Sequence, residues 1–186
     1  TVGLLGSMGT LQIDGLTIEE VPVGGAETTE LILNGDFELG NPTPPFWTLE
    51  DGAHRAFPGY RSDSALELSG AGCRALNGLG VRADRLPNLQ MRIVAKGTNL
   101  RRSGGGRAVI YYLDADGRNL PPPDDGAPLF RWNGTFEWKE DRATVRVPTA
   151  AVRAVIQVET LDSGGSLLID DVSVRATPDA DVGVWT

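Results

Sequence analysis

One segment decides the fold: Gly165-Ser166-Leu167-Leu168-Ile169-Asp170-Asp171-Val172-Ser173-Val174. Leu167 and Ile169 alternate on one face of a predicted β-strand, whereas Val172 and Val174 alternate in the opposite phase. Because side chains along a strand alternate with a period of two, this change of phase requires an extra residue, that is, a β-bulge. The pattern places the bulge at Asp170-Asp171, so two carboxylates are expected where the strand kinks.

The same pattern occurs near the start of the chain, at Gly9-Thr10-Leu11-Gln12-Ile13-Asp14-Gly15-Leu16-Thr17-Ile18. Four of the ten positions are identical, four more are close replacements, and the phase changes at the same place. The two copies lie about one domain length apart. We therefore expect residues 1–29 to hold the end strand of a preceding module and a linker. Residues 30–176 are expected to form one β-sandwich module, and residues 177–186 a C-terminal tail or linker.

The composition favours an all-β fold. The 186 residues suffice for one well-buried domain, and 24 glycines and 12 prolines divide the chain into many short segments. Further strands are predicted at the start of Glu30–Glu38 and at Ser64–Ser69, Leu89–Lys96, Arg107–Asp114, Gly134–Trp138, Thr144–Val147 and Arg153–Thr160. No segment has a convincing helical pattern. This predicts an antiparallel two-sheet β-sandwich of the jelly-roll type.

The charged and reactive residues argue against several classes of protein. The net charge is −8 and the basic residues are scattered, which argues against a nucleic-acid partner and against an anionic membrane surface. No apolar run could span a membrane, and Thr1–Met8 does not resemble a signal peptide. Because the chain starts with Thr, we expect an excised or processed fragment. One histidine, His54, and one cysteine, Cys73, leave no His-based metal cluster and no internal disulfide. No pair of carboxylates stands out as a glycosidase pair, so an enzyme is not expected.

Three motifs resemble those of a known family. They are Leu33-Asn34-Gly35-Asp36-Phe37-Glu38 followed by Trp47, then Gly134-Thr135-Phe136-Glu137-Trp138-Lys139, and finally Leu168–Val174. Together they resemble the jelly-roll, galactose-binding-like carbohydrate-binding modules that bind xylan and β-glucan, over about Leu31 to Arg175. The resemblance implies a non-catalytic extracellular or cell-surface module of a multimodular protein, with polysaccharide as its partner. Related jelly rolls serve as spacers or interaction modules, so the fold alone does not identify the ligand.

The resemblance also implies a structural calcium ion that joins the opening loop to the last strand. The matching ligands are the carbonyl of Asp36, the carboxylate of Glu38, and Asp170, whose place is taken by Asp14 in the N-terminal copy. Calcium takes several oxygen ligands, and a bulge supplies free carbonyls beside a carboxylate. The alternative is that Asp36 and Glu38 are ordinary turn acids.

Sugar binding requires exposed aromatic rings beside hydrogen-bonding side chains. Tyr111 and Tyr112 are neighbours in a strand, so they point to opposite faces, and the sequence does not decide which one faces the core. Trp132 follows a proline-rich loop and is predicted to be a platform, whereas Trp47 and Trp138 are expected to pack. The candidate carbohydrate-binding residues are Trp132, Tyr111, Tyr112, Tyr60, Arg92, Gln90 and Gln157.

Two other functions remain open. The strand predicted at Gly9–Ile18 could pair with a neighbouring copy of the chain and build a fibre or surface layer by donor-strand addition. The module could also be a spacer without a sugar site. Neighbouring modules or copies of the same chain would then be its partners.

Overall fold

The computed structural model describes residues 30–83, 86–102, 104–121, 128–161, 164–177 and 184–185. Twelve β-strands lie in these residues: β1 (Thr48–Glu50), β2 (His54–Ala56), β3 (Ala65–Ser69), β4 (Arg74–Gly80), β5 (Asn88–Leu100), β6 (Gly106–Leu113), β7 (Asn119–Leu120), β8 (Phe130–Trp132), β9 (Gly134–Arg146), β10 (Arg153–Thr160), β11 (Ser166–Thr177) and β12 (Val184–Trp185). The described residues contain no helix, and so none that could cross a membrane.

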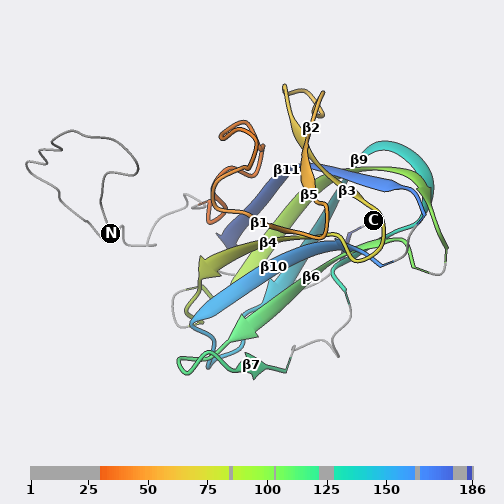
Figure 1. Cartoon of the computed structure of the whole chain (residues 1–186). Coiled ribbons are helices and arrows are strands. Elements are labelled where there is room, and N and C mark those ends of the chain that lie inside the picture. The colour runs from red at the N-terminus through yellow and green to blue at the C-terminus, as the bar shows by residue number, and fades with distance from the viewer. Residues whose placement is uncertain are drawn as a thin grey trace, which may run out of the picture.

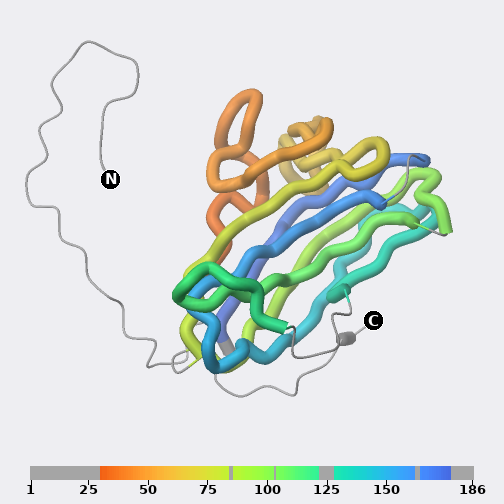
Figure 2. Tube along the Cα trace, turned by 60° about the horizontal axis from the view of Figure 1, so that its bottom comes forward, coloured from red at the N-terminus to blue at the C-terminus, as the bar shows by residue number. Residues whose placement is uncertain are grey.

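The strands form two antiparallel sheets that face each other (Figures 1 and 2). Sheet A has the order β12-β9-β5-β11-β3-β2. Sheet B has the order β1-β4-β10-β6-β7, with β8 also paired to β6. In Figure 1 the strands β4, β10 and β6 of sheet B lie in front of sheet A. The predicted all-β jelly-roll sandwich is confirmed.

The bulge in β11 is confirmed. Asp170 lies opposite Val94 of β5, but Ser173 lies opposite Arg92, so the register shifts between them. Asp171 takes the left-handed conformation, with a φ of 49°. As a result all four apolar residues on either side of the shift, namely Leu167, Ile169, Val172 and Val174, are buried in the core. The strand also lies in the middle of its sheet, between β5 and β3.

The core between the sheets is built from the predicted alternating positions. Leu89, Met91, Ile93 and Ala95 of β5 are buried, and so are Ala154, Ile156 and Val158 of β10. The predicted segments Gly134–Trp138 and Thr144–Val147 lie in the single strand β9, except for Val147, which directly follows it. Long strands of this kind give each sheet a continuous apolar inner face.

The opening segment differs from its prediction. The strand predicted at the start of Glu30–Glu38 is reduced to a single bridge between Glu30 and Arg175. After it the chain turns at Asn34, whose φ is 55°, and Phe37 is buried against Trp47 with ring centroids 5.0 Å apart. A Cβ on Gly35 would lie 1.9 Å from the carbonyl oxygen of Val172, so only glycine allows this close approach. The segment therefore packs against the bulge instead of extending the sheet.

The predicted domain boundaries fall largely on residues that the structure does not describe. Residues 1–29, which include the duplicated segment Gly9–Ile18, lie outside the described residues, so the donor-strand idea stays a prediction. Within the predicted C-terminal tail, Val184 and Trp185 pair with Ala143 and Arg142 of β9.

Candidate functional site

Two of the predicted sugar-binding residues lie in the core, which corrects their assignment. Tyr112 is 1% exposed because it shares the inner face of β6 with Ala108. Trp132 is 2% exposed because it belongs to strand β8 and not to the preceding loop. Its ring stacks on Phe130 at 5.9 Å, and its Nε1 donates a hydrogen bond of 2.7 Å to Asp141. Neither ring can offer a face to a ligand at the surface.

Tyr111 lies on the opposite, outer face of sheet B and is 39% exposed. It stands opposite Val155 of β10, which stands opposite Gly78 of β4. A Cβ on Gly78 or Gly80 would meet nothing within 4 Å. Since directly opposed residues in antiparallel strands project to the same side, the Val155 side chain lies between the ring and a strip of β4 that carries no side chains at Gly78 and Gly80. We name the Tyr111 ring the aromatic wall; it stands two strands away from this bare part of β4.

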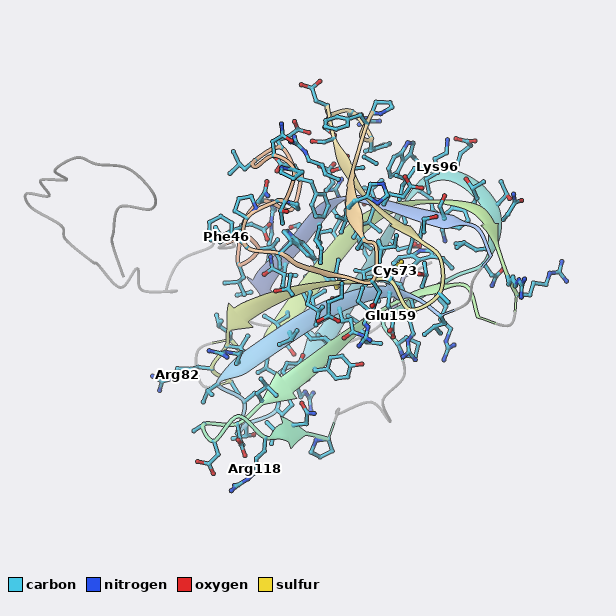
Figure 3. All side chains as sticks on the ribbon, in the orientation of Figure 1. Phe46, Cys73, Arg82, Lys96, Arg118 and Glu159 are labelled. Carbon is cyan, nitrogen blue, oxygen red and sulfur yellow. The ribbon has the colours of Figure 1, made fainter. Side chains whose placement is uncertain are left out.

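A row of charged side chains crosses the same face two rows further along the strands. Glu159 of β10 lies opposite Arg74 of β4 and Arg107 of β6, and Arg107 lies opposite Arg131 of β8. The Arg107 Nε donates to Glu159 at 2.5 Å, and Glu159 is only 6% exposed. Figure 3 labels Glu159 on the sheet that faces the viewer. These arginines supply hydrogen-bond donors on the same face as the Tyr111 ring, two rows away from it.

Gln157 lies between the aromatic wall and the charged row. It stands opposite Leu76 and Val109 and is largely buried by them. We name Tyr111, Gly78, Gly80, Gln157, Glu159, Arg74, Arg107 and Arg131 the sheet B face. Sequence reasoning identified only Tyr111 and Gln157 of this set, because the arginines and Glu159 become neighbours through the strand register alone.

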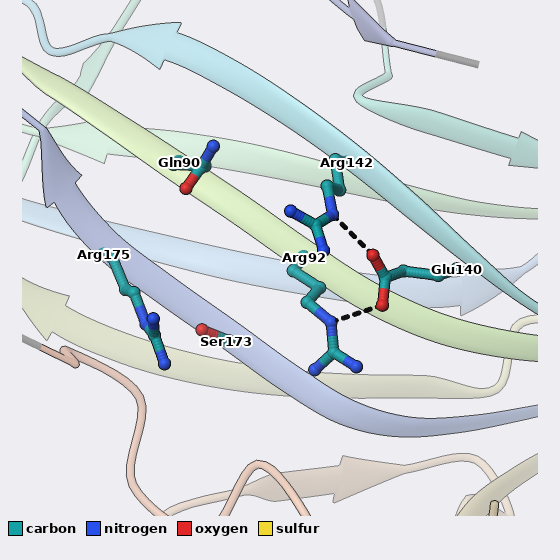
Figure 4. A pocket seen from close by; sticks show the side chains of 6 residues that line it. All are labelled: Gln90, Arg92, Glu140, Arg142, Ser173 and Arg175. Atoms are coloured by element: carbon teal, nitrogen blue, oxygen red, sulfur yellow. Dashed lines mark hydrogen bonds and ion pairs between the residues drawn. The ribbon is translucent and has the colours of Figure 1, made fainter. Parts of the chain in front are cut away.

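The remaining candidates lie on the outer face of sheet A. Gln90 and Arg92 of β5 line a hollow of about 330 Å³ together with Glu140, Arg142, Ser173 and Arg175 (Figure 4). We name these six residues the arginine hollow. Tyr60 lies on the loop that leads to β3 and packs against Trp138, with ring centroids 5.7 Å apart. The structure thus separates the sequence candidates onto two opposite faces.

Asp170 is fully buried beneath the loop that carries Tyr60. One carboxylate oxygen accepts hydrogen bonds from Tyr60 N and Ser62 Oγ, both at 2.7 Å, and the other accepts from Asp171 N at 2.7 Å. Burial raises the pKa of Asp170, although these three hydrogen bonds oppose the shift. Asp170 therefore fastens the loop to the bulged strand.

Glu38, the second predicted calcium ligand, is held by Ser64 and Arg55. Its carboxylate accepts hydrogen bonds from Ser64 N at 2.8 Å and from Ser64 Oγ at 2.9 Å. The guanidinium of Arg55 lies 3.9 Å from the same carboxylate and donates to the Glu38 carbonyl at 3.0 Å, to Ser64 Oγ at 2.6 Å, and to the carbonyl of Gly40. The opening loop thus already contacts a positive charge.

Two of the predicted calcium ligands, Glu38 and Asp170, already accept hydrogen bonds from the protein. Glu38 and Asp170 belong to one network, because Ser62 Oγ contacts both Asp170 and the Ser64 carbonyl. The side-chain Oδ1 of Asp36, which is not the predicted carbonyl ligand, accepts a hydrogen bond from Glu38 N at 3.4 Å. Their oxygens face protein donors, and the described residues contain no group of three or more His, Cys, Asp or Glu that could hold a metal ion. Calcium stays a prediction, which chelation tests.

No protein-family model matches the chain, and no curated protein matches its sequence. Solved structures do resemble it. The enzymatically active domain of tailspike protein 4 from bacteriophage CBA120 is 17% identical, with a TM-score of 0.61, over 80% of this chain but only 21% of the tailspike chain. TmCBM61, solved with β-1,4-galactotriose, is 14% identical with a TM-score of 0.53, over 80% of this chain and 99% of the module.

A third similar structure is the C-terminal family 22 carbohydrate-binding module of Clostridium thermocellum Xyn10B. It is 16% identical, with a TM-score of 0.56, over 82% of this chain and 96% of the module. At such low identity the likeness concerns the fold alone. The chain has the jelly-roll β-sandwich fold of carbohydrate-binding modules.

Proposed function

We propose that this chain is a carbohydrate-binding module that holds a polysaccharide on the sheet B face. The observation that carries the proposal is the 39% exposed Tyr111, on the same face of the sheet as Gly78 and Gly80 of β4, which carry no side chains. A flat ring presented from a rigid strand can stack on the C–H face of a sugar. Because Gly78 and Gly80 have no side chains, a chain of sugars has room to lie along β4.

The charged row gives the face its polar partners. Arg107 and Arg74 are held by acidic neighbours, through Glu159 at 2.5 Å and Glu50 at 3.6 Å, so their guanidinium groups are fixed in direction. Fixed donors bind hydroxyl groups with little loss of side-chain entropy. The fold likeness to a galactotriose-bound module supports a sugar as the ligand. Xylan or β-glucan is our first choice, from the sequence resemblance.

We further propose that the module is non-catalytic, extracellular and part of a larger multimodular protein. A glycosidase needs two carboxyl groups that flank the bond to be cleaved. On the sheet B face, as far as it is described, Glu159 is the central carboxylate and its ion pair with Arg107 occupies it. Glu50 and Asp51 lie at the edge of the sheet and pair with Arg74. This arrangement suits binding and not bond cleavage.

Calorimetric titration with xylohexaose, β-1,4-galactotriose, a mixed-linkage β-glucan oligosaccharide and mannohexaose tests the proposal. We expect saturable binding of at least one neutral oligosaccharide. Affinity electrophoresis in gels that contain the corresponding polysaccharides covers ligands longer than these oligosaccharides. If neither method detects binding while the melting transition shows a folded protein, the glycan-binding proposal is overturned and the spacer or assembly functions remain.

A further inference from the structure

We propose that the arginine hollow on the outer face of sheet A is a second binding site, for the carboxylate of an acidic sugar. The site is independent of the sheet B face, because the two lie on opposite sides of the sandwich. Its ligand class is a uronic acid residue within a polysaccharide. The argument rests on the strand register, the hydrogen bonds of the arginines, and the size and lining of the hollow.

The three arginines are brought together by three neighbouring strands. Arg142 of β9 lies directly opposite Arg92 of β5, and Arg92 lies opposite Ser173 of β11. In the adjacent row, Gln90 lies opposite Arg175. Two like charges directly opposite each other normally destabilise a sheet. A structure that retains such a pair needs either an internal counter-charge or a ligand that supplies one.

Glu140 supplies the internal counter-charge. Its two carboxylate oxygens accept hydrogen bonds from Arg92 Nε at 2.6 Å and from Arg142 Nε at 2.5 Å (Figure 4). These hydrogen bonds lower the pKa of Glu140. One carboxylate therefore fixes two guanidinium groups by their inner nitrogens, and their outer nitrogens project beyond it.

The outer nitrogens of Arg142 and Arg175 remain available for a ligand. In the part of the chain that the structure describes, Arg142 has only its Nε hydrogen bond to Glu140, and Arg175 has only its Nε hydrogen bond to Glu30, at 3.3 Å. Arg92 makes two further long contacts to Asp171, at 3.3 and 3.4 Å. Paired guanidinium nitrogens match the two oxygens of a carboxylate.

The hollow also has the size and the neutral groups that a sugar requires. Its volume of about 330 Å³ is at the lower end of the range for ligand pockets, so it suits a single residue of a polymer. Gln90 and Ser173 line it and can exchange hydrogen bonds with ring hydroxyls. The lining itself holds three arginines and one carboxylate, whereas Glu30 and Asp171, which contact Arg175 and Arg92, lie outside the lining. This excess of arginines within the lining favours a carboxylate over a neutral sugar.

A matched pair of ligands tests the proposal: trigalacturonate and the neutral galactose trimer with the same linkage, titrated at low ionic strength. We expect the wild-type protein to bind trigalacturonate more tightly than the neutral trimer. Added salt should weaken the binding of the acidic ligand only. Replacing both arginines, in Arg142→Gln/Arg175→Gln, removes charge-assisted hydrogen bonds and should weaken trigalacturonate binding by roughly 10- to 100-fold.

Two control variants separate the possible outcomes. Arg118→Gln removes an exposed arginine from the turn between β6 and β7, paired to Asp116, and should leave trigalacturonate binding unchanged. Tyr111→Ala should weaken neutral-glycan binding while leaving the acidic ligand unaffected, so failure of the sheet B proposal does not affect this one. Equal affinity for the two trimers, or full binding by the folded double variant, would overturn the proposal.

Discussion

Replacing Tyr111 with alanine measures directly what its ring contributes to the free energy of sugar binding. The side chain is 39% exposed, and a whole aromatic side chain buries about 200 Å², so a stacked sugar would cover roughly 80 Å². At about 25 cal/mol per Å² the loss is about 2 kcal/mol, which corresponds to roughly 30-fold in Kd. The Tyr111→Phe variant keeps the ring and should retain most of the affinity, because stacking does not require the hydroxyl.

The assay is calorimetric titration with the best neutral oligosaccharide found for the wild-type protein. Phe57→Ala is the matched control, since Phe57 is 67% exposed but lies outside the sheet B face. It removes more exposed aromatic surface than Tyr111→Ala and should leave the Kd unchanged. The reasoning is refuted if Tyr111→Ala stays folded and binds within about twofold of wild type, or if the two alanine variants weaken binding equally.

Four further predictions concern stability. Because burial raises the native pKa of Asp170 above its ordinary value of 3.8, the native state holds this proton more tightly than the unfolded chain. The free energy of unfolding of wild type, measured relative to that of Asp170→Asn, should therefore decrease as the pH rises above 3.8 through the native pKa. Urea titrations in which this difference increases with pH would contradict the prediction. Because Glu38 and Asp170 already bind protein donors, EDTA should leave the melting temperature unchanged; a fall on chelation would instead support calcium. Arg55→Met should lower the free energy of unfolding by roughly 1–3 kcal/mol, measured by urea titration, and an unchanged value would contradict the role of its hydrogen bonds. Asn77 buries its amide nitrogen without a hydrogen-bond partner among the described residues, so Asn77→Val should stabilise the protein by about 1 kcal/mol, seen as a higher melting temperature by calorimetry, and a lower one would show that the amide is bonded.

The bulged strand could be predicted because its hydrophobic residues record which face is buried. Leu167 and Ile169 must lie on the same side as Val172 and Val174, and only an extra residue achieves this. The opening segment could not be predicted as well. Its apolar start is typical of a strand, yet the close approach of Gly35 to Val172 bends it away from the sheet. That approach is a tertiary contact between distant parts of the chain, and the sequence around Gly35 does not indicate it.

The binding faces could be predicted only in part. Val109 and Ile110 are both apolar, so the two faces of β6 look alike and the choice between Tyr111 and Tyr112 required the structure. The prediction that Trp132 is a surface platform is wrong, because the preceding prolines are typical of a loop but Trp132 lies in β8. Arg92 was predicted to be outward from its alternation, whereas Arg142 becomes its neighbour only through the register of β5 and β9, which contains two shifts.

The position of β11 affects how the chain can fold. It joins β5 to β3 in sheet A, and β10 likewise joins β4 to β6 in sheet B. Strands from the first two thirds of the chain therefore keep unpaired edges until these later strands have left the ribosome. Pairing between segments about a hundred residues apart is slow, and open edges recruit neighbouring chains. Truncation before Ser166 should thus yield an aggregating product and not a smaller domain, and chaperones would be needed most until β10 and β11 have been synthesised.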